Sequence, residues 1–533
     1  PETVPRWLKG WRRRMLIGYL SDEQHVAIAG AWVTLENESG RWDLRSQADG
    51  ALLADVAPGE YQVTLNHADF GGKRVRATIR EDDPCQFRLM SDSLVGYMWP
   101  KWVRVGQGSE YRIHSSEAFR LDLYRYGWEK KLVRELGWCD EHGPEAMRQV
   151  APDTDFTRTG MQWNQVGHTI EFQKHRLEAP AESGLYFLHA RTASGRFFSF
   201  PWIVSPAEPC SEIAVMTSNI TWNAYNNYGG RSNYFNQDGL RDRPVVYSRQ
   251  DIERYTRPGL WPYEDRSAPL SFERPELASC VPEHASITDT ISGRMQSAFA
   301  PGEWRLLGWL EREKFSYDLY SETELHFGTL PLEQYRVLVL NTHPEYWSLE
   351  MYQRVKRWVQ EEGGRLVYLA GCGLYAEVEF VDESTMLCCR EGETELRGES
   401  EASLLGVAYS HEGFQSGAPY RVLDGEHWVF DGTGLETGSC FGFQSLHERC
   451  PGGASGHELD KIGPASPAGL EHLAKGDNPG GSGADMVLYQ TASGGAVFSA
   501  GSLCWTLSIP VDDGVSKVTA NVLRRFLDRA WLS

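Results

Sequence analysis

The sequence predicts an α/β domain built on a parallel sheet, preceded by two small β-sandwich domains. Two observations support this prediction. Residues 11–207 consist of short alternating segments separated by turn signals, which is typical of antiparallel sandwiches. From residue 208 onward, longer apolar segments alternate with amphipathic ones, as in βαβ units.

The composition is that of a globular protein with room for several domains. The 533 residues carry a formal net charge of -20, which argues against a nucleic acid or an anionic membrane as the main partner. No apolar run approaches the roughly 20 residues that span a bilayer. The ten cysteines are scattered without a C-x-x-C pair, and the apolar run after Arg12–Arg14 is too short for a signal peptide. We therefore expect free thiols and a cytoplasmic location, with an initiator Met removed or lying upstream of Pro1.

Residues 11–91 are expected to form the first sandwich. Residues 29–35 favour a strand, a turn follows at 38–40, and residues 61–65 alternate polar and apolar side chains. The run from Gly30 to Phe70 resembles the transthyretin-like, carboxypeptidase-regulatory type of module. That resemblance implies a role in contacts or assembly, so we assign no catalysis to this region.

Residues 92–207 are expected to form the second β domain. Residues 119–126 alternate in the manner of a half-buried strand, and the segments 184–190 and 197–204 complete the strand-rich pattern. The prolines of 205–209 then indicate a linker.

Residues 208–533 are expected to form the α/β domain. Strands are predicted at 212–217, 337–340 and 365–370. Helices are predicted at 304–312, 349–359 and 516–527, the second of them capped by Ser348 and ended by Gly363-Gly364. Residues 376–450 do not follow the βα rhythm, so we expect a β-rich insertion there.

The strand at 337–340 ends abruptly in a polar motif, Asn341-Thr342-His343-Pro344-Glu345-Tyr346-Trp347. Open α/β sheets bind ligands in the crevice at the carboxyl ends of their strands. A capped strand end with a solvated His and Glu would give the same composition. Because His343 and Glu345 stand two residues apart at this point, we favour an enzyme with its site just past a strand end.

Two more strand ends carry candidate site residues. Residues 221–234, rich in Tyr and Asn with paired glycines, form a loop whose backbone can approach a ligand closely, although a polar surface loop would look the same. The third strand ends in Gly371-Cys372-Gly373, where a nucleophile activated by His343 would suit a glutamine-amidotransferase-like sheet. The competing interpretation of Cys372 is a buried packing residue.

Six motifs occur together in order: "TWNAYNNYGGRSNY", "LSFERP", "LVLNTHPEYWS", "YLAGCGLY", "GGASGHELD" and "GADMVLYQTASGGAVFSAGSLCW". In this combination residues 208–533 resemble the large (beta) subunit of the N,N-dimethylformamidase family. The resemblance implies a mononuclear Fe(III) site, held by two tyrosines and one carboxylate, that hydrolyses a small amide.

Carried over residue by residue, the resemblance implies metal ligands Tyr225, Tyr263 and Glu345, with Tyr228 as the alternative to Tyr225. It also implies that His343 and Glu458 assist the water and proton steps. Phenolate and carboxylate oxygens are hard donors that suit a highly charged cation, which lowers the pKa of bound water. Packing is the competing explanation for the tyrosines in a chain that has 23 of them.

One motif departs from the expected family pattern, because Gly371-Cys372-Gly373 stands where we expect Gly-Asn-Gly. The loss of an amide from a pocket wall puts the substrate in doubt more than the metal. Two alternatives stay open: a metal-free hydrolase that uses Cys372 as its nucleophile, and a non-catalytic binding or assembly protein. The expected partners are a small-molecule amide, further copies of the chain in a homo-oligomer and, by the resemblance, a small partner subunit.

Overall fold

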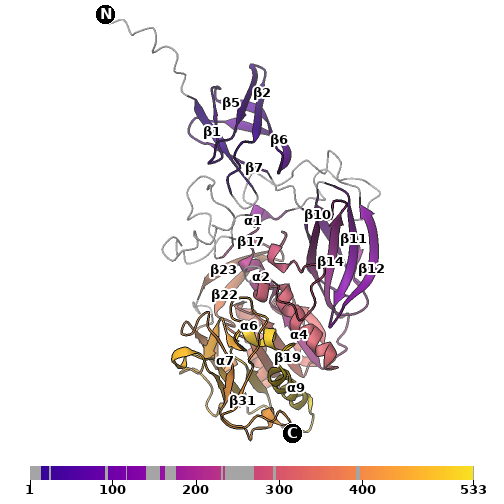
Figure 1. The fold of residues 1–533 in the computed structure, drawn as a ribbon, viewed down its shortest axis with the longest axis vertical. Coiled ribbons are helices and arrows are strands. Elements are labelled where there is room, and N and C mark those ends of the chain that lie inside the picture. The colour runs from indigo at the N-terminus through magenta and orange to yellow at the C-terminus, as the bar shows by residue number, and fades with distance from the viewer. Residues whose placement is uncertain are drawn as a thin grey trace, which may run out of the picture.

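The structure is a computed structural model that describes residues 14–22, 26–89, 94–115, 117–139, 156–161, 176–229, 232–233, 269–291, 296–391 and 397–531. It is rich in β-structure and contains several separate sheets. In Figure 1 the N-terminal strands lie at one end of the long axis and the C-terminal elements at the other.

The N-terminal strands form two sheets that pack face to face. Their orders are β4-β1-β7 and β3-β2-β5-β6. Apolar side chains such as Ile17, Val33 and Leu65 are fully buried between them, so this unit has its own core. The strands are β1 (Met15–Ser21), β2 (Trp32–Asn37), β3 (Gly40–Arg45), β4 (Ala51–Ala54), β5 (Gly59–His67), β6 (Gly71–Ile79) and β7 (Cys85–Arg88).

The second group of strands also forms two sheets around a separate core that includes Leu121, Leu188 and Trp202. Their orders are β13-β10-β8 and β12-β11-β14-β15-β9. Sandwich-like packing is thus present in both N-terminal regions, whereas the exact domain boundaries stay a prediction. The strands are β8 (Val95–Trp99), β9 (Trp102–Arg104), β10 (Gly108–His114), β11 (Phe119–Tyr126), β12 (Lys130–Cys139), β13 (Arg176–Glu178), β14 (Gly184–Thr192) and β15 (Phe197–Ser205). The short helix α1 (Phe156–Thr159) lies between β12 and β13 in sequence.

A nine-stranded sheet of order β18-β16-β19-β21-β32-β31-β30-β26-β27 organises the rest of the chain. Its first five strands pair in parallel and the last four are added antiparallel. The parallel strands are β16 (Ile213–Thr217), β18 (Asp318–Ser321), β19 (Val337–Thr342), β21 (Arg365–Ala370) and β32 (Ala496–Ser499). The antiparallel ones are β26 (Tyr420–Val422), β27 (Cys440–Phe441), β30 (Glu471–Gly476) and β31 (Asp485–Gln490). The three strands predicted from apolar runs are therefore neighbours in the parallel part.

Helices cover both faces of this sheet, and successive side chains of its strands point alternately into the two cores on either side. Val337 and Val339 pack with α4 (Ala300–Arg312), α8 (Cys504–Ser508) and α9 (Asp513–Leu527). Leu338 and Leu340 pack on the other face with α5 (Glu322–His326) and α6 (Leu349–Glu361). Such two-sided burial explains why these strands are continuous apolar runs. The likeness to an amidotransferase sheet stays a prediction.

The remaining elements are short. A four-stranded sheet has the order β17-β23-β22-β20, and two small pairs are β24–β29 and β25–β28. Within the predicted β-rich insertion at 376–450, β26 and β27 join the central sheet, and the bounds of the insertion stay a prediction. The bounds are α2 (Asn219–Tyr225), β17 (Leu270–Ser271), β20 (Tyr346–Trp347), β22 (Ala376–Asp382), β23 (Thr385–Glu391), α7 (Ala402–Leu405), β24 (Ala408–Ser410), β25 (Gly417–Ala418), β28 (Ser455–Gly456) and β29 (Leu459–Lys461).

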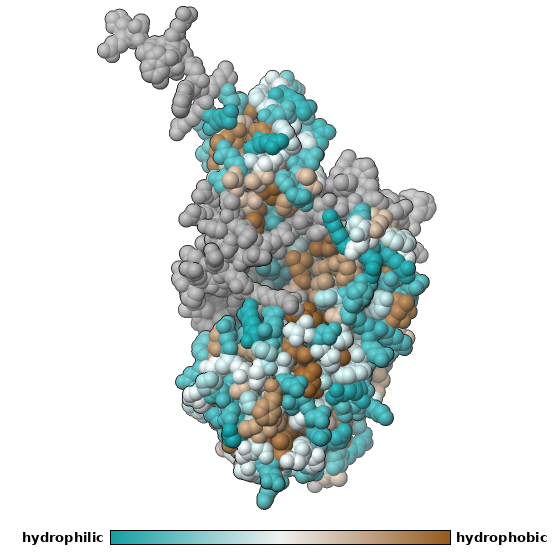
Figure 2. Space-filling view, in the orientation of Figure 1, coloured by the Kyte–Doolittle hydropathy of each residue, from teal (hydrophilic) through white to brown (hydrophobic). Residues whose placement is uncertain are grey.

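Polar residues dominate the visible surface of the C-terminal part, with apolar side chains gathered near the middle of the molecule (Figure 2). Among the described residues, no helix is long and apolar enough to cross a membrane.

Candidate active site

The ends of β16 and β19 are joined by hydrogen bonds at one edge of the sheet. Ser218, directly after β16, donates its hydroxyl to the carbonyl oxygen of Asn341 at 2.8 Å. The same hydroxyl oxygen accepts the backbone N–H of His343 at 3.2 Å. Thr342 between them has a φ of 63°, a left-handed conformation that is rare for a β-branched residue. This turn fixes the direction in which His343 leaves the strand.

Helix α2 brings Tyr225 to the carboxylate that follows β19. The Tyr225 hydroxyl donates a hydrogen bond to Oε2 of Glu345. The backbone N–H of Glu345 in turn donates to the Thr221 hydroxyl at 3.2 Å, which ties α2 to this loop. Tyr225 and Glu345 were predicted to share a site from motifs 120 residues apart, and the structure places them in contact.

Glu458 reaches the same place from the segment between β28 and β29. Its Oε2 lies 2.7 Å from Nε2 of His343, and that nitrogen lies 3.4 Å from Oε2 of Glu345. His343 and Glu345 are buried, with exposed fractions of 0% and 2%, and Glu458 is nearly so. The four side chains Tyr225, His343, Glu345 and Glu458 are called the phenol–carboxylate cluster below.

Burial and charge act in opposite directions on the pKa values of His343 and Glu458 and in the same direction on that of Tyr225. Burial lowers the pKa of His343, but the carboxylates of Glu458 and Glu345 outweigh it and raise the pKa to about 9. Burial raises the pKa of Glu458, yet the nearby His343 brings the net pKa below its usual value. Burial, and then the Glu345 and Glu458 carboxylates, hold the pKa of Tyr225 well above its usual value. Near neutral pH, a His343 imidazolium therefore faces the Glu458 carboxylate.

Cys372 also lies close to this cluster. Its thiol, a nitrogen of His343 and a carboxylate oxygen of Glu345 all lie within 4.8 Å of one another. Cys372 has a φ of 53°, and its backbone N–H donates to Oδ1 of Asp460 at 2.8 Å. No helix follows this turn directly, because the chain enters β22 at Ala376, so a helix N-terminus is not what would activate the thiol.

The glycines beside Cys372 are required by close packing. A Cβ at Gly371 would lie 2.4 Å from the carbonyl oxygen of Glu458, and one at Gly373 would lie 2.6 Å from the ring of Tyr368. Gly371 therefore lets the segment that carries Glu458 approach the end of β21, and Gly373 makes room for the Tyr368 ring.

Not every predicted site residue is placed at the cluster. Tyr263 lies outside the described residues, so its assignment stays a prediction. Tyr228, the alternative to Tyr225, packs into the core of the second β region.

Two groups near the cluster were not predicted. Asp460 accepts hydrogen bonds from Cys372 and Tyr368, and burial raises its pKa to about 7. The ring centroid of Tyr346 lies 6.3 Å from that of Tyr225. Asp460 belongs to the motif "GHELD" and Tyr346 to the motif "HPEYW". Their position beside Glu458 and Glu345 in these motifs was the sequence signal that could have identified them.

The donor set fits a hard metal ion. Two carboxylates and a phenol share the cluster with one imidazole, so anionic donors exceed the cationic group, and a bound cation would balance them. Nδ1 of His343 is buried and has no hydrogen-bond partner among the described residues. Glu345 and Tyr225 offer the oxygen atoms that such an ion prefers.

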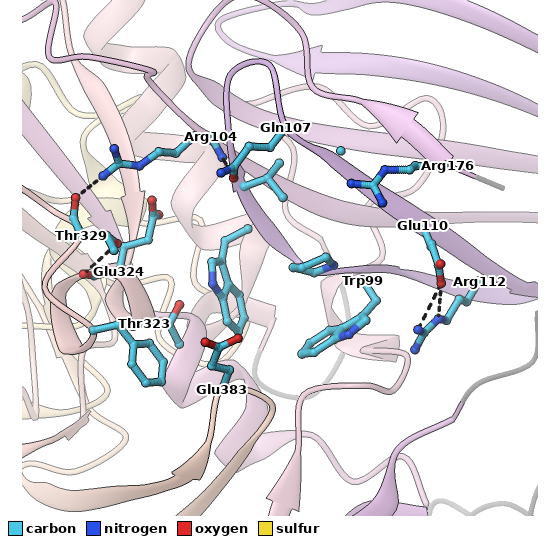
Figure 3. Close-up of a pocket in the computed structure, with 15 residues that line it drawn as sticks. Trp99, Arg104, Gln107, Glu110, Arg112, Arg176, Thr323, Glu324, Thr329 and Glu383 are labelled. Carbon is cyan, nitrogen blue, oxygen red and sulfur yellow. Dashed lines mark hydrogen bonds and ion pairs between the residues drawn. The ribbon is translucent and has the colours of Figure 1, made fainter. Parts of the chain in front are cut away.

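A cavity of about 610 Å³ lies elsewhere, between the second β region and α5. Figure 3 shows its polar wall, where Arg104 bonds Thr329 and Arg112 pairs with Glu110. None of the four residues of the phenol–carboxylate cluster lines it. The cavity and the phenol–carboxylate cluster are therefore separate places in the structure.

Buried, mutually interacting acid–base groups thus lie at the carboxyl ends of parallel strands, which is where ligands bind in sheets of this kind. The family comparison is more specific. A protein-family model described as "N,N-dimethylformamidase beta subunit-like, C-terminal" matches residues 120–518, well over half of the chain. The chain belongs to this family, which confirms the resemblance drawn from the six motifs.

Individual relatives match over a shorter length. The N,N-dimethylformamidase beta subunits of an Alcaligenes species and of Paracoccus aminophilus are each 26% identical to the chain over 287 residues. Each match covers 43% of this chain and 37% of the relative. A trypsin-activated alpha-2-macroglobulin from Escherichia coli aligns over 34% of this chain and 15% of its own length, with 12% identity and a TM-score of 0.12, which carries no argument about the fold.

Proposed function

We propose that the chain hydrolyses the C–N bond of a small amide with the help of a mononuclear ferric ion held by Tyr225, Glu345 and Tyr263. The observation that carries this proposal is the phenol–carboxylate cluster at the end of β19, in a chain whose family is named for dimethylformamidase. A bound ferric ion would polarise the amide carbonyl and lower the pKa of a water molecule.

His343 and Glu458 have complementary proton roles in this proposal. Because the pKa of His343 is raised to about 9, its ring carries a proton at neutral pH and is able to donate it to the leaving amine. Glu458, whose pKa is lowered, stays ionised and is able to accept a proton from the attacking water. Their 2.7 Å separation lets the proton pass between them, which restores the starting state.

The near-complete burial of His343 and Glu345 explains why the substrate is expected to be small. A shielded site strengthens the interactions of charged groups with a developing oxyanion. Because Cys372 stands where we expect an Asn from the family pattern, the substrate is not assumed to be dimethylformamide, which is tested as one of several small amides. By analogy with the beta-subunit names of the relatives, we also propose assembly with further subunits.

The test is elemental analysis of the purified chain, its visible spectrum and its turnover of a panel of small amides. We expect near-stoichiometric iron, a broad phenolate-to-ferric absorption band and release of free amine. Glu345→Gln should lose the iron and the activity, and Tyr225→Phe should lose or shift the band. The matched control is Glu350→Gln, because Glu350 is exposed on α6. Full activity in Glu345→Gln would exclude the proposal.

One observation favours a second candidate, a metal-free hydrolase with Cys372 as nucleophile. The thiol lies within 4.8 Å of a His343 nitrogen, near enough for base activation after a small movement. This mechanism requires activity that resists chelators and disappears in Cys372→Ser. The ferric mechanism requires the opposite pattern, namely sensitivity to chelation and a substantial rate in Cys372→Ser.

A further inference from the structure

A second cluster of metal-ligating side chains lies outside the phenol–carboxylate cluster. His447, Cys450 and His457 are buried, and one potential ligand atom of each lies within 4.8 Å of those of the other two. Cys504, the first residue of α8, is fully buried beside them, with its Sγ 3.9 Å from the carbonyl oxygen of Cys450. These four residues are called the Cys/His cluster below.

Two local features of the backbone assemble the Cys/His cluster. Nδ1 of His447 accepts the backbone N–H groups of Arg449 and Cys450, each at 3.1 Å, so a tight turn brings residues 447 and 450 together. A Cβ at Gly456 would lie only 2.9 Å from Sγ of Cys504. Glycine at this position therefore gives the Cys504 thiol the room it needs to reach the cluster.

Two buried nitrogen atoms of this cluster are left without partners. Nε2 of His447 and Nδ1 of His457 have no hydrogen-bond partner among the described residues, and their side chains are 2% and 4% exposed. Leaving such an atom unsatisfied costs about 1–3 kcal/mol, and buried polar atoms are rarely left so. Nδ1 of His457 is thus a vacant acceptor beside two thiols, which indicates that a further group belongs at this place.

The Cys450 thiol is set up to be a thiolate. A hydrogen bond from Cys504 lowers its pKa first, burial opposes this, and the imidazoles of His447 and His457 lower it further, to about 3. Thiolate is the form of cysteine that binds metals. Thiolate sulfur with imidazole nitrogen is the donor set of closed, tetrahedral zinc sites.

We propose that Cys450, Cys504 and His457 bind a divalent cation of zinc type, with His447 as the fourth ligand. Three protein ligands and the His447 imidazole as the fourth, all in a buried place, leave no open position for substrate, so the proposed role is structural. Nδ1 of His447 already accepts two N–H groups, which leaves the ring proton on Nε2. His447 must therefore turn its ring to coordinate, and we expect it to contribute least to the affinity.

The Cys/His cluster is connected to the phenol–carboxylate cluster through one carboxylate. Nε2 of His457 lies 3.9 Å from Oε1 of Glu458, whose other oxygen lies 2.7 Å from His343. A cation on Nδ1 of His457 fixes the ring with its Nε2–H toward Glu458, the usual carboxylate–histidine–metal arrangement. His457 is thus a positioning residue that holds Glu458 against His343.

The test uses the full chain, stripped with a chelator and titrated with Zn²⁺ or Co²⁺. It is run in the wild type and in Glu345→Gln, which removes the proposed iron site, so that failure of the iron proposal does not obscure the result. We expect a thiolate-to-Co²⁺ charge-transfer band in both, and one tightly bound ion per chain in Glu345→Gln. Cys450→Ser and His457→Asn should weaken binding by at least about 10-fold, and His447→Asn should weaken it less. The matched control is Cys388→Ser, a buried cysteine of β23, which should bind normally.

Two results would overturn the proposal. One is a Co²⁺ spectrum without thiolate character in the wild type. The other is unchanged affinity in a folded Cys450→Ser variant. If that variant does not fold, X-ray absorption at the zinc edge of the wild type decides, because sulfur ligands at about 2.3 Å and nitrogen ligands at about 2.0 Å are required. Coordination by oxygen alone would refute the site.

Discussion

The substitution Glu458→Gln separates the forces that set the charge of His343. In the wild type, burial lowers the pKa of His343 and the carboxylates of Glu458 and Glu345 raise it to about 9, against an ordinary value of 6.5. Glu458 is the strongest of the raising groups and the closer of the two. Without it we expect burial to dominate and the pKa to fall below 6.5, a change of more than about 3 kcal/mol in the free energy of protonation.

The charge of His343 is measured directly by nitrogen NMR on metal-free protein labelled with ¹⁵N-histidine. At pH 7.5 the wild type should show an imidazolium at position 343, and Glu458→Gln should show a neutral ring. Glu412→Gln, whose exposed carboxylate pairs with Lys461, should behave as the wild type. An imidazolium that persists in Glu458→Gln up to pH 9 would refute the assignment of Glu458 as the controlling group.

The same pair predicts how stability depends on pH. The folded pKa of His343 lies above 6.5, so its contribution is complete below pH 6.5 and is lost as the pH rises through about 9. The folded pKa of Glu458 is lowered, so its contribution is present above its ordinary value of 4.5 and is lost as the pH falls. The difference in thermal stability between wild type and Glu458→Gln should therefore be largest between about pH 5 and 6.5 and shrink toward pH 9. A difference that stays constant over that range would contradict the linkage.

Three further substitutions test the framework that holds the site. Gly371→Ala places a Cβ 2.4 Å from the Glu458 carbonyl oxygen, so we expect a displaced Glu458 and a free energy of unfolding that is lower by about 1–3 kcal/mol in denaturant titrations. Wild-type stability would show that the contact is easily relieved. Thr221→Val removes the hydroxyl that accepts the Glu345 N–H, so it should lower the free energy of unfolding by about 1 kcal/mol and reduce iron retention. Unchanged iron retention would mean that α2 does not position Glu345. Ser348→Ala removes the N-cap of α6 and should lower the free energy of unfolding by about 1 kcal/mol without changing the metal content. A loss of iron would show that α6 is coupled to the site.

The strands and helices of the central sheet were predictable because their signals are local. The fully buried strands β19 and β21 contain the uninterrupted apolar runs 337–340 and 366–370. Helix α6 has a Ser348 N-cap and a glycine with a φ of 79° just past its end. The extension of the sheet by β26 and β27 was not predicted, since strands of two or three residues carry too little pattern to be told from loops.

The site was predictable from strand ends for His343, Glu345 and the loop that carries Tyr225, whereas Glu458 and the ligand roles were predicted only through the family resemblance. Tyr225, His343 and Glu345 follow two adjacent parallel strands, so topology alone places them near one edge. Glu458 comes from a segment 115 positions beyond His343, and long-range contacts bring it there, namely the packing against Gly371 and the hydrogen bond that its carbonyl oxygen accepts from Leu503. The Cys/His cluster gave no sequence signal, because its ligands are spaced irregularly and Cys504 belongs to a helix that follows β32.

The distribution of strained backbone gives an independent reason to regard this edge of the sheet as functional. Six non-glycine residues have positive φ among the described residues, and four of them are Thr342, Cys372, Leu374 and His457. Each such residue costs on the order of 1–3 kcal/mol, and persists only where surrounding contacts impose it. The contacts are present: the N–H of Cys372 donates to Asp460, that of Leu374 to Pro344, and that of His457 to Ser416. If this edge served packing alone, relaxed conformations would fill it at lower cost. The strain instead falls on Thr342 and His457, which directly precede His343 and Glu458, and on Cys372, whose thiol lies within 4.8 Å of His343 and Glu345 ligand atoms. The backbone is therefore constrained where His343 and Glu458 leave their segments.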